Sequence, residues 1–310
     1  MKVSVVMCSY NVSRFIDQAI QSIIAQTYQD WELIISDDCY ADNTVALIQP
    51  YLTDKRIRLV QQPKNLGYVR NKNTALQMAT GDLVTQLDSD DTCHPLRLEK
   101  QVAAFKANPG LKACSTGFNI IEEDNRIKEE SPAIKEGFIQ ELMIEYPFSL
   151  VGIMLPKEVW EEFGYLNEYF AGSVGEDHYL VWRINLRYPI YCIPDRMYNY
   201  RINHNSVTHT YDNPRKLIGG LLLEELQRQM TTTGTDWLTD GQLDKAKAHE
   251  QKLLANDSVM AERYRIWAAK AVNKESFSEA NKFLAKSLSA KFFHPRTLST
   301  IRYYLRKRFF

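Results

Sequence analysis

The first hundred residues switch repeatedly between two patterns of apolar and polar positions. Short β-branched runs such as "VSVVM" and "IRLVQ" are typical of buried strands, whereas apolar side chains recur at helical spacing across residues 12–24. Strands that alternate with helices in this way indicate a parallel sheet with helices on both faces. The predicted strands cover residues 3–7, 31–36, 57–61 and 83–87, and the predicted helices cover residues 12–24, 43–49 and 69–79.

Polar and acidic side chains stand where these predicted strands end. The positions are Ser9, Asp37, Asp38, Asp88 and Asp90. In parallel α/β sheets, ligands bind in the crevice beyond the carboxyl ends of the strands. The pattern therefore predicts one binding site at that edge of the sheet.

The stretch "LDSDD" places three carboxylates within four residues, and such a cluster repels itself unless a cation neutralises it. Asp88 and Asp90 can converge on one Mg²⁺ or Mn²⁺ as hard oxygen ligands and leave open positions for the phosphates of a nucleotide. The alternative is that these residues cap the helix that begins near Pro95. Capping needs one carboxylate rather than three, and Asp91 is the one best placed for it.

Asp38 and Arg70 are suited to bind two different parts of a nucleotide. A carboxylate at the end of the second strand is placed to bind ribose hydroxyls or the N–H of a base, although an ordinary turn also explains it. Arg70 follows the tight turn of Asn65 and Gly67, where its planar donors suit a diphosphate. A surface ion pair is the other interpretation of Arg70.

Glu176 and Asp177 begin a predicted helix directly after Gly175, in "SVGEDHYLVWR". The helix dipole favours ionised carboxylates at this end. An ionised aspartate beside a bound sugar is what a general base needs in order to take a proton from an acceptor hydroxyl. Capping of the helix by one of the two acids is the alternative.

The middle third of the chain is less regular. Residues 122–137 are mostly charged and predict a solvated hairpin or loop, whereas "IYCIP" at residues 190–194 predicts a short strand. After about residue 213 the composition changes to helical segments separated by polar stretches. We therefore divide the chain into an α/β domain, residues 1–213, and a helical region, residues 214–310.

The last thirty residues carry eight Lys or Arg and no acidic residue. This basic end is either a solvated helix face or an aromatic, cationic segment that rests on an anionic membrane surface. The helical region as a whole builds an acceptor site, forms an oligomer, or docks on a membrane, and the sequence leaves these alternatives open.

Composition narrows the class of protein. The net charge of zero excludes a global polybasic field of the kind that holds nucleic acid. Five scattered cysteines without CxxC spacing argue for a reducing compartment and against a disulfide framework or a zinc site. No window approaches the roughly 20 apolar residues that span a bilayer. We expect a cytoplasmic protein without nucleic acid as a partner.

Five stretches together carry a family resemblance. "VSVVMCSYN", "SDDCYADNT", "NLGYVRN", "LDSDD" and "GEDHYLVWR", in this order and spacing, resemble an inverting family 2 glycosyltransferase with the GT-A fold. The resemblance covers about residues 1 to 210. It implies a Rossmann-like, mostly parallel sheet flanked by helices, and a bacterial hexosyltransferase that transfers sugar from a nucleotide diphosphate donor, usually UDP-linked, to an acceptor hydroxyl.

The resemblance also implies roles for individual residues. Asp177 is the implied base, assisted or oriented by Glu176, and Asp90 is the leading ligand of a Mn²⁺ or Mg²⁺ ion. Asp88 is implied to lie beside the metal ion and the ribose or sugar of the donor. The residues implied to bind the nucleotide sugar are Ser9, Tyr10, Asn11, Asp38, Asn65, Arg70, Asp88 and Ser89.

Two departures from the family pattern stand out. Members often carry Gly-Ser-Thr after the paired aspartates of the second strand, whereas this chain has Cys39, Tyr40 and Ala41. Members also often have "YRxH", whose histidine touches metal or phosphate, whereas here Asn203 stands at that place and His204 follows it. His204 is therefore either an ordinary loop histidine or a further metal ligand.

The expected partners are a nucleotide-sugar donor and a glycan or lipid-linked acceptor, in the synthesis of surface polysaccharide or lipopolysaccharide. Peripheral contact with the inner face of the membrane fits the basic end. A nucleotidyltransferase is one alternative, but "CSYNVSRF" lacks the glycine-rich loop that holds a triphosphate. A catalytically inactive nucleotide-sugar-binding module is another, and the presence of Glu176 and Asp177 argues against it.

Overall fold

The structure, a computed structural model, describes residues 1–39, 42–141, 143, 146–203, 206, 213–273, 276–291 and 295–309. It divides into two compact units. Unit 1 comprises residues 1–171 and 175–210, and unit 2 comprises residues 172–174 and 211–310. Each unit has its own core and is described by itself.

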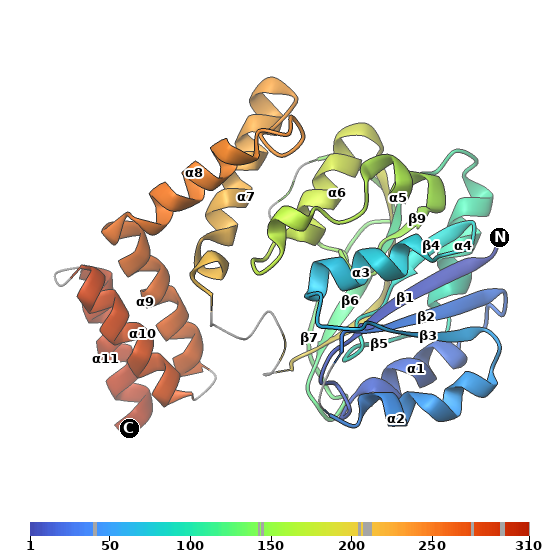
Figure 1. Cartoon of the computed structure of the whole chain (residues 1–310), viewed down its shortest axis with the longest axis horizontal. Helices are drawn as coiled ribbons and strands as arrows, with labels where there is room; N and C mark the ends of the chain where they lie inside the picture. The colour runs from blue at the N-terminus through green and yellow to red at the C-terminus, as the bar shows by residue number, and fades with distance from the viewer. Residues whose placement is uncertain are drawn as a thin grey trace. The chain divides into compact units, whose positions relative to one another are not determined.

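Unit 1 is built on one mixed sheet, whose described strands run in the order β3-β2-β1-β4-β9-β6-β10-β5, with β7 paired to β6 and β8 paired to β10 (Figure 1). The four strands predicted in the first hundred residues are all present. The strands are β1 (Val3–Ser9), β2 (Trp31–Asp37), β3 (Ile57–Gln61), β4 (Leu83–Gln86), β5 (Thr92–Cys93), β6 (Cys114–Ile121), β7 (Ile127–Glu130), β8 (Gly137–Ile139), β9 (Met154–Pro156) and β10 (Ile190–Arg201).

The sheet is parallel where the sequence predicts it and mixed elsewhere. Strands β3, β2, β1 and β4 are parallel neighbours, and β6 is parallel to β10. The short strand β9 lies antiparallel between β4 and β6. Strand β10 extends well beyond the predicted residues 190–194, because it pairs along the whole of β6 to Arg201.

Helices cover both faces of this sheet, as the alternation of strands and helices predicts. Helices α1 and α4 share one apolar core with the side chains of Val5, Leu33 and Leu83, whereas α3, α5 and α6 lie on the opposite side (Figure 1). The helices of unit 1 are α1 (Ile16–Ile24), α2 (Thr44–Ile48), α3 (Tyr68–Gln77), α4 (Arg97–Ala107), α5 (Lys157–Phe163) and α6 (Glu176–Arg187), with the short 3-10 turns η1 (Gln49–Thr53) and η2 (Glu168–Phe170).

Unit 2 is helical throughout its described residues. Its three last helices enclose an apolar core that includes Ala268, Phe283 and Tyr304. None of the helices in the described part of the chain is long and apolar enough to cross a bilayer. The helices are α7 (Pro214–Thr233), α8 (Leu243–Leu254), α9 (Asp257–Asn273), α10 (Phe277–Ala290) and α11 (Pro295–Phe309).

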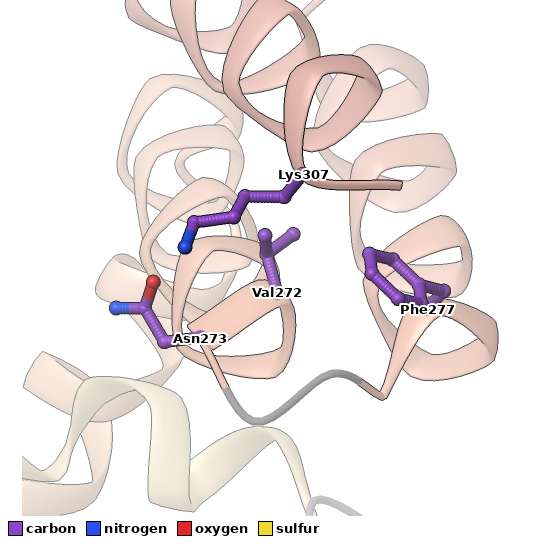
Figure 2. Close-up of a pocket in the computed structure, with 4 residues that line it drawn as sticks. All are labelled: Val272, Asn273, Phe277 and Lys307. Carbon is purple, nitrogen blue, oxygen red and sulfur yellow. The ribbon is translucent and has the colours of Figure 1, made fainter. Parts of the chain in front are cut away.

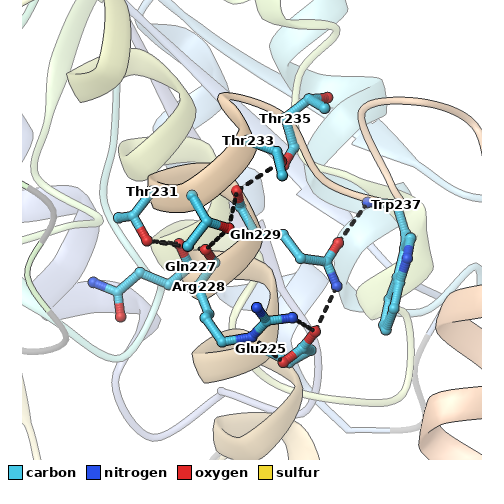
Figure 3. Close-up of polar contacts among 9 residues, drawn as sticks. Glu225, Gln227, Arg228, Gln229, Thr231, Thr233, Thr235 and Trp237 are labelled. Atoms are coloured by element: carbon cyan, nitrogen blue, oxygen red, sulfur yellow. Dashed lines mark hydrogen bonds and ion pairs between the residues drawn. The ribbon is translucent and has the colours of Figure 1, made fainter.

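An amide side chain helps to hold the link from α7 to α8. Gln229 donates to the Glu225 carboxylate at 2.8 Å and accepts from the Trp237 backbone N–H at 3.1 Å (Figure 3). Gly234 ends α7 in the left-handed conformation, with φ of 77°, which only glycine adopts at little cost. The turn that follows the long helix is therefore defined by its own polar contacts.

Candidate functional site

The carboxyl ends of the parallel strands bring the expected polar side chains to one edge of the sheet. Ser9 is the register partner of Asp37 at the ends of β1 and β2. Its hydroxyl donates to the Asp37 carboxylate at 3.2 Å, and both side chains are buried. Burial raises the pKa of Asp37, and the hydrogen bond from Ser9 works against that rise. Ser9 and Asp37 thus hold each other in place where the two strands end.

Lys72, which the sequence analysis did not single out, lies at the centre of the acidic groups. This residue of α3 is 1% exposed, and its ammonium nitrogen is 3.0 Å from a carboxylate oxygen of Asp88. Burial lowers the pKa of Lys72, but the negative charges of Asp88, Asp177 and Glu176 outweigh burial and raise it. A permanent cation therefore neutralises part of the charge that "LDSDD" concentrates.

Tyr68, one helical turn before Lys72, completes the surroundings of this cation. The Lys72 ammonium lies 4.4 Å from the centre of the Tyr68 ring and donates to its hydroxyl. The Tyr68 hydroxyl is also hydrogen-bonded to the carboxylate of Glu176. Tyr68 and Lys72 thus link α3 to the start of α6.

Glu176 and Asp177 form the first turn of α6, after Gly175 in a left-handed conformation with φ of 112°. Burial, and next the charge of Asp177, raise the pKa of Glu176 to about 7. Burial also raises the pKa of Asp177, while Lys72 lowers it and Asp88 raises it. Glu176 therefore exchanges its proton near neutral pH, the range in which proton-transfer groups are most useful.

The loop of residues 88–91 holds its carboxylates in different surroundings. Asp90 accepts a hydrogen bond from the side-chain amide of Asn203 at 2.9 Å. Burial, then the charge of Asp88, raise the pKa of Asp90. Ser89 is buried between them. Asp88 and Asp90 are therefore close enough to influence each other, as a shared cation site requires.

Asp91 does not cap the helix that follows. Its two carboxylate oxygens accept hydrogen bonds from the Tyr198 hydroxyl at 2.6 Å and the Arg201 backbone N–H at 2.7 Å. The N-cap residue of α4 is Leu96, which has no capping side chain, and the Leu98 N–H of the first turn donates instead to the side-chain oxygen of Gln26 at 3.0 Å. The expectation that Asp91 caps this helix is wrong, because β10 passes beside the loop and takes up the carboxylate.

Arg201, at the end of β10, fastens this loop to its neighbours. Its guanidinium donates to the Asp90 carbonyl at 2.6 Å, and further donors reach Gln18 and Asn125. The side chain is 1% exposed. Like Lys72, Arg201 was missed as a site residue, although it is the arginine of the "YRxH" pattern that the sequence analysis compared with the family.

Asp38 and Asn65 together shape one turn. Both oxygens of the buried Asp38 carboxylate accept backbone N–H groups, from Leu66 at 2.6 Å and Gly67 at 3.0 Å. Asn65 also accepts from the Gly67 N–H at 2.9 Å. Gly67 has φ of 81°, a conformation that favours glycine. This turn therefore sets the direction in which α3 starts, and so the place of Lys72.

Arg70 is oriented differently from Lys72. Its guanidinium donates to the Glu168 carboxylate at 2.9 Å, and the two side chains are 59% and 53% exposed. This is the surface ion pair that the sequence allowed as an alternative to a diphosphate contact. Tyr10 and Asn11, by contrast, are exposed after the end of β1, and Asn11 has φ of 53°.

Few of the described side chains are placed to act as ligands of a divalent cation. No group of three or more His, Cys, Asp or Glu side chains that could hold a metal is found among the residues that the structure describes. Mg²⁺ is commonly bound through one or two carboxylates and substrate phosphates, and Asp88 with Asp90 fit that arrangement. His204 lies outside the described residues.

The chain matches the family model "Glycosyl transferase family 2" over residues 4–160. It is 38% identical over 106 residues to the UDP-Glc:alpha-D-GlcNAc-diphosphoundecaprenol beta-1,3-glucosyltransferase WfgD of Escherichia coli, which aligns 34% of this chain with 42% of WfgD. The aligned part spans less than half the length of the first curated relatives that the chain matches.

Solved structures show the same fold over nearly the whole chain. TarS of S. aureus matches with a TM-score of 0.58 at 17% identity, covering 99% of this chain and 53% of TarS. A structure of TarS 1-349 in complex with UDP-GlcNAc matches with a TM-score of 0.56 at 16% identity, covering 99% of this chain and 81% of that one. The expected fold class, a flanked sheet with a helical C-terminal region, is confirmed.

Proposed function

Because this chain belongs to glycosyl transferase family 2, we propose that it transfers a sugar from a UDP-linked donor to a hydroxyl of a glycan or lipid-linked acceptor in cell-surface polysaccharide synthesis. The UDP-GlcNAc complex of TarS supports the donor class. The name of WfgD, which specifies a diphosphoundecaprenol acceptor, supports a lipid-linked acceptor. We assign the chemistry to residues 1–213.

The observation that carries this proposal is the convergence of Asp88, Glu176 and Asp177 on the buried cation of Lys72. An acid held with its pKa near neutrality beside a second acid is suited to proton transfer at physiological pH. We assign the proton acceptor to Asp177, and to Glu176 the task of orienting it from the same turn of α6.

In the proposed reaction, Asp177 takes the proton of the acceptor hydroxyl. The acceptor oxygen then forms a bond to the anomeric carbon of the donor sugar from the opposite side of the bond that breaks. The bonding electrons of the broken C–O bond leave with the nucleoside diphosphate. The configuration at the anomeric carbon is inverted, and no covalent enzyme intermediate forms.

The residues at the strand ends hold the donor. We assign Asp38 to the base, and Ser9, Tyr10, Asn11 and Asn65 to the pocket around the nucleoside. Arg70 reaches a diphosphate once it leaves Glu168, and Asp88 and Ser89 lie toward the ribose and sugar. Asp90 and Asp88 would hold a Mn²⁺ or Mg²⁺ ion, which offsets the charge of the departing diphosphate when it is bound.

Calorimetric titration of nucleotides tests the proposal directly. UDP, GDP, dTDP and CDP are titrated into the wild-type chain and Asp90→Ala, with Mn²⁺ and then with EDTA. We expect one diphosphate, UDP, to bind in the presence of the metal, and Asp90→Ala to lose this binding. Absence of binding of all four nucleotides under both conditions contradicts the proposal, and binding of another diphosphate alone contradicts the UDP assignment.

A further inference from the structure

Helix α11 presents large apolar side chains to solvent. Leu298, Tyr303 and Leu305 are 50%, 37% and 45% exposed, although such side chains are usually buried. Among the described residues, nine large apolar side chains reach this level of exposure, and three of them belong to this one helix. The apolar surface is therefore concentrated on α11.

The exposed side chains form a stripe because of their spacing. Residues three, four and seven apart lie on one side of a helix, so Leu298, Arg302 and Leu305 follow one another along it. Arg306 lies beside them, whereas Tyr303 lies farther round the helix and its hydroxyl donates to the side-chain oxygen of Asn273. On the inner side, Tyr304 and Ile301 pack into the core made with α9 and α10. The stripe therefore faces away from the core of unit 2.

No described residue neutralises the cations of the stripe. Arg302 and Arg306 form no ion pair with any residue that the structure describes, and residues 281–310 contain no acid. Arg296, outside the stripe, is instead paired with Glu262 at 3.2 Å. Lys307 extends across a cavity of about 330 Å³ that Val272, Asn273 and Phe277 also line (Figure 2).

This combination of charge and exposure favours one kind of occupant. A second copy of the chain, docked through the same face, brings arginines against arginines, and this repulsion opposes the contact. An anionic lipid surface pairs phosphate groups with the arginines and accepts the leucines at the boundary of the acyl chains. We propose that the stripe of Leu298, Arg302, Leu305 and Arg306 docks on an anionic bilayer, with α11 lying along its surface.

Vesicle co-sedimentation of the full chain tests this docking, independently of the reaction catalysed by unit 1. We expect the protein to sediment with vesicles of phosphatidylcholine and phosphatidylglycerol, and not with phosphatidylcholine alone. High salt weakens the binding because it screens the arginines. Equal binding to both kinds of vesicle, or no binding to either at low salt, overturns the proposal.

Two double variants locate the contact. Arg302→Gln with Arg306→Gln is expected to weaken binding to anionic vesicles about 25-fold, since each cation at the surface is worth about fivefold. Leu298→Gln with Leu305→Gln is expected to weaken it at least about tenfold. Because all four side chains are exposed, the midpoint of thermal unfolding stays unchanged.

Matched controls come from α8 of the same unit. Lys245→Gln with Lys252→Gln removes the same charge from exposed positions, and Leu243→Gln changes an exposed leucine. These variants are expected to bind vesicles like the wild type. Equal losses in the controls overturn the assignment to α11. If the leucine variant separates a dimer in sedimentation velocity but keeps vesicle binding, the occupant is a second copy and the proposal is wrong.

Discussion

The ammonium of Lys72 and the carboxylate of Asp88 lie 3.0 Å apart, joining the middle of α3 to the loop after β4. The lysine is buried, whereas 24% of the Asp88 side chain is exposed. Removing one partner of such a pair leaves the other charge poorly compensated. The pair therefore makes the order of the acidic site depend on one basic residue of α3.

Lys72→Met is expected to destabilise the chain by about 3 kcal/mol near pH 8, because Asp88, Glu176 and Asp177 then repel one another without a cation. The loss becomes smaller near pH 6, since the acids whose pKa is raised take up protons. Urea unfolding at both pH values measures it. Lys72→Arg, which keeps the charge, serves as the control, and a loss independent of pH would contradict this explanation.

Asp177→Asn is expected to keep donor binding and lose sugar transfer. The amide cannot take a proton from the acceptor, and general bases contribute roughly 10²- to 10⁴-fold to a rate. Calorimetry with the donor nucleotide and a transfer assay on the same preparation separate the two effects. Equal loss of binding and of transfer would show that Asp177 holds the site together instead of acting as its base.

The rate of transfer is expected to fall as the pH is lowered, because burial raises the pKa of Asp177 and only its ionised form can accept a proton. Asp88→Asn removes the negative charge that raises the pKa of Asp177, and so moves this acid limb to lower pH. A pH–rate profile measures the shift. Glu161→Gln, at an exposed position of α5, is expected to leave the limb in place.

Tyr198→Phe is expected to destabilise the chain by about 1.5 kcal/mol, because Asp91 is buried and loses the hydrogen bond from the Tyr198 hydroxyl. Chemical denaturation checks the value. Tyr191→Phe is a suitable comparison, since its hydroxyl bonds to the Glu136 carboxylate at an exposed position. If the two substitutions lowered the free energy of unfolding equally, burial of Asp91 would not contribute to the loss.

Much of the site could be predicted because its residues follow strands. Ser9 and Asp37 end neighbouring parallel strands, and parallel pairing alone brings them together. The third strand was predicted from its own apolar run, and Asp38 could be placed because it directly follows the second strand. The order of motifs along the chain also identified the family correctly, since it depends on residue types and spacing and not on packing.

Lys72 was missed because its burial depends on contacts that are distant in sequence. Its neighbours Asp88 and Asp177 lie on the loop after β4 and on α6. A signal does exist in the sequence. Val69, Lys72 and Leu76 share one side of a helix, and a lysine on an apolar side needs a buried anion. Arg201 was missed for a similar reason, as the length of β10 depends on pairing with β6.

The position of β9 also bears on how the chain acquires its structure during synthesis. Strands β3, β2, β1 and β4 can pair as soon as residue 86 has emerged, because all four lie early in the chain. β6 joins them only through Met154–Pro156, and β10 completes its pairing at Arg201. The edge of β4 in this four-stranded half therefore stays unpaired while about seventy further residues are translated. We expect the pairing of β9 with this edge to limit the folding rate.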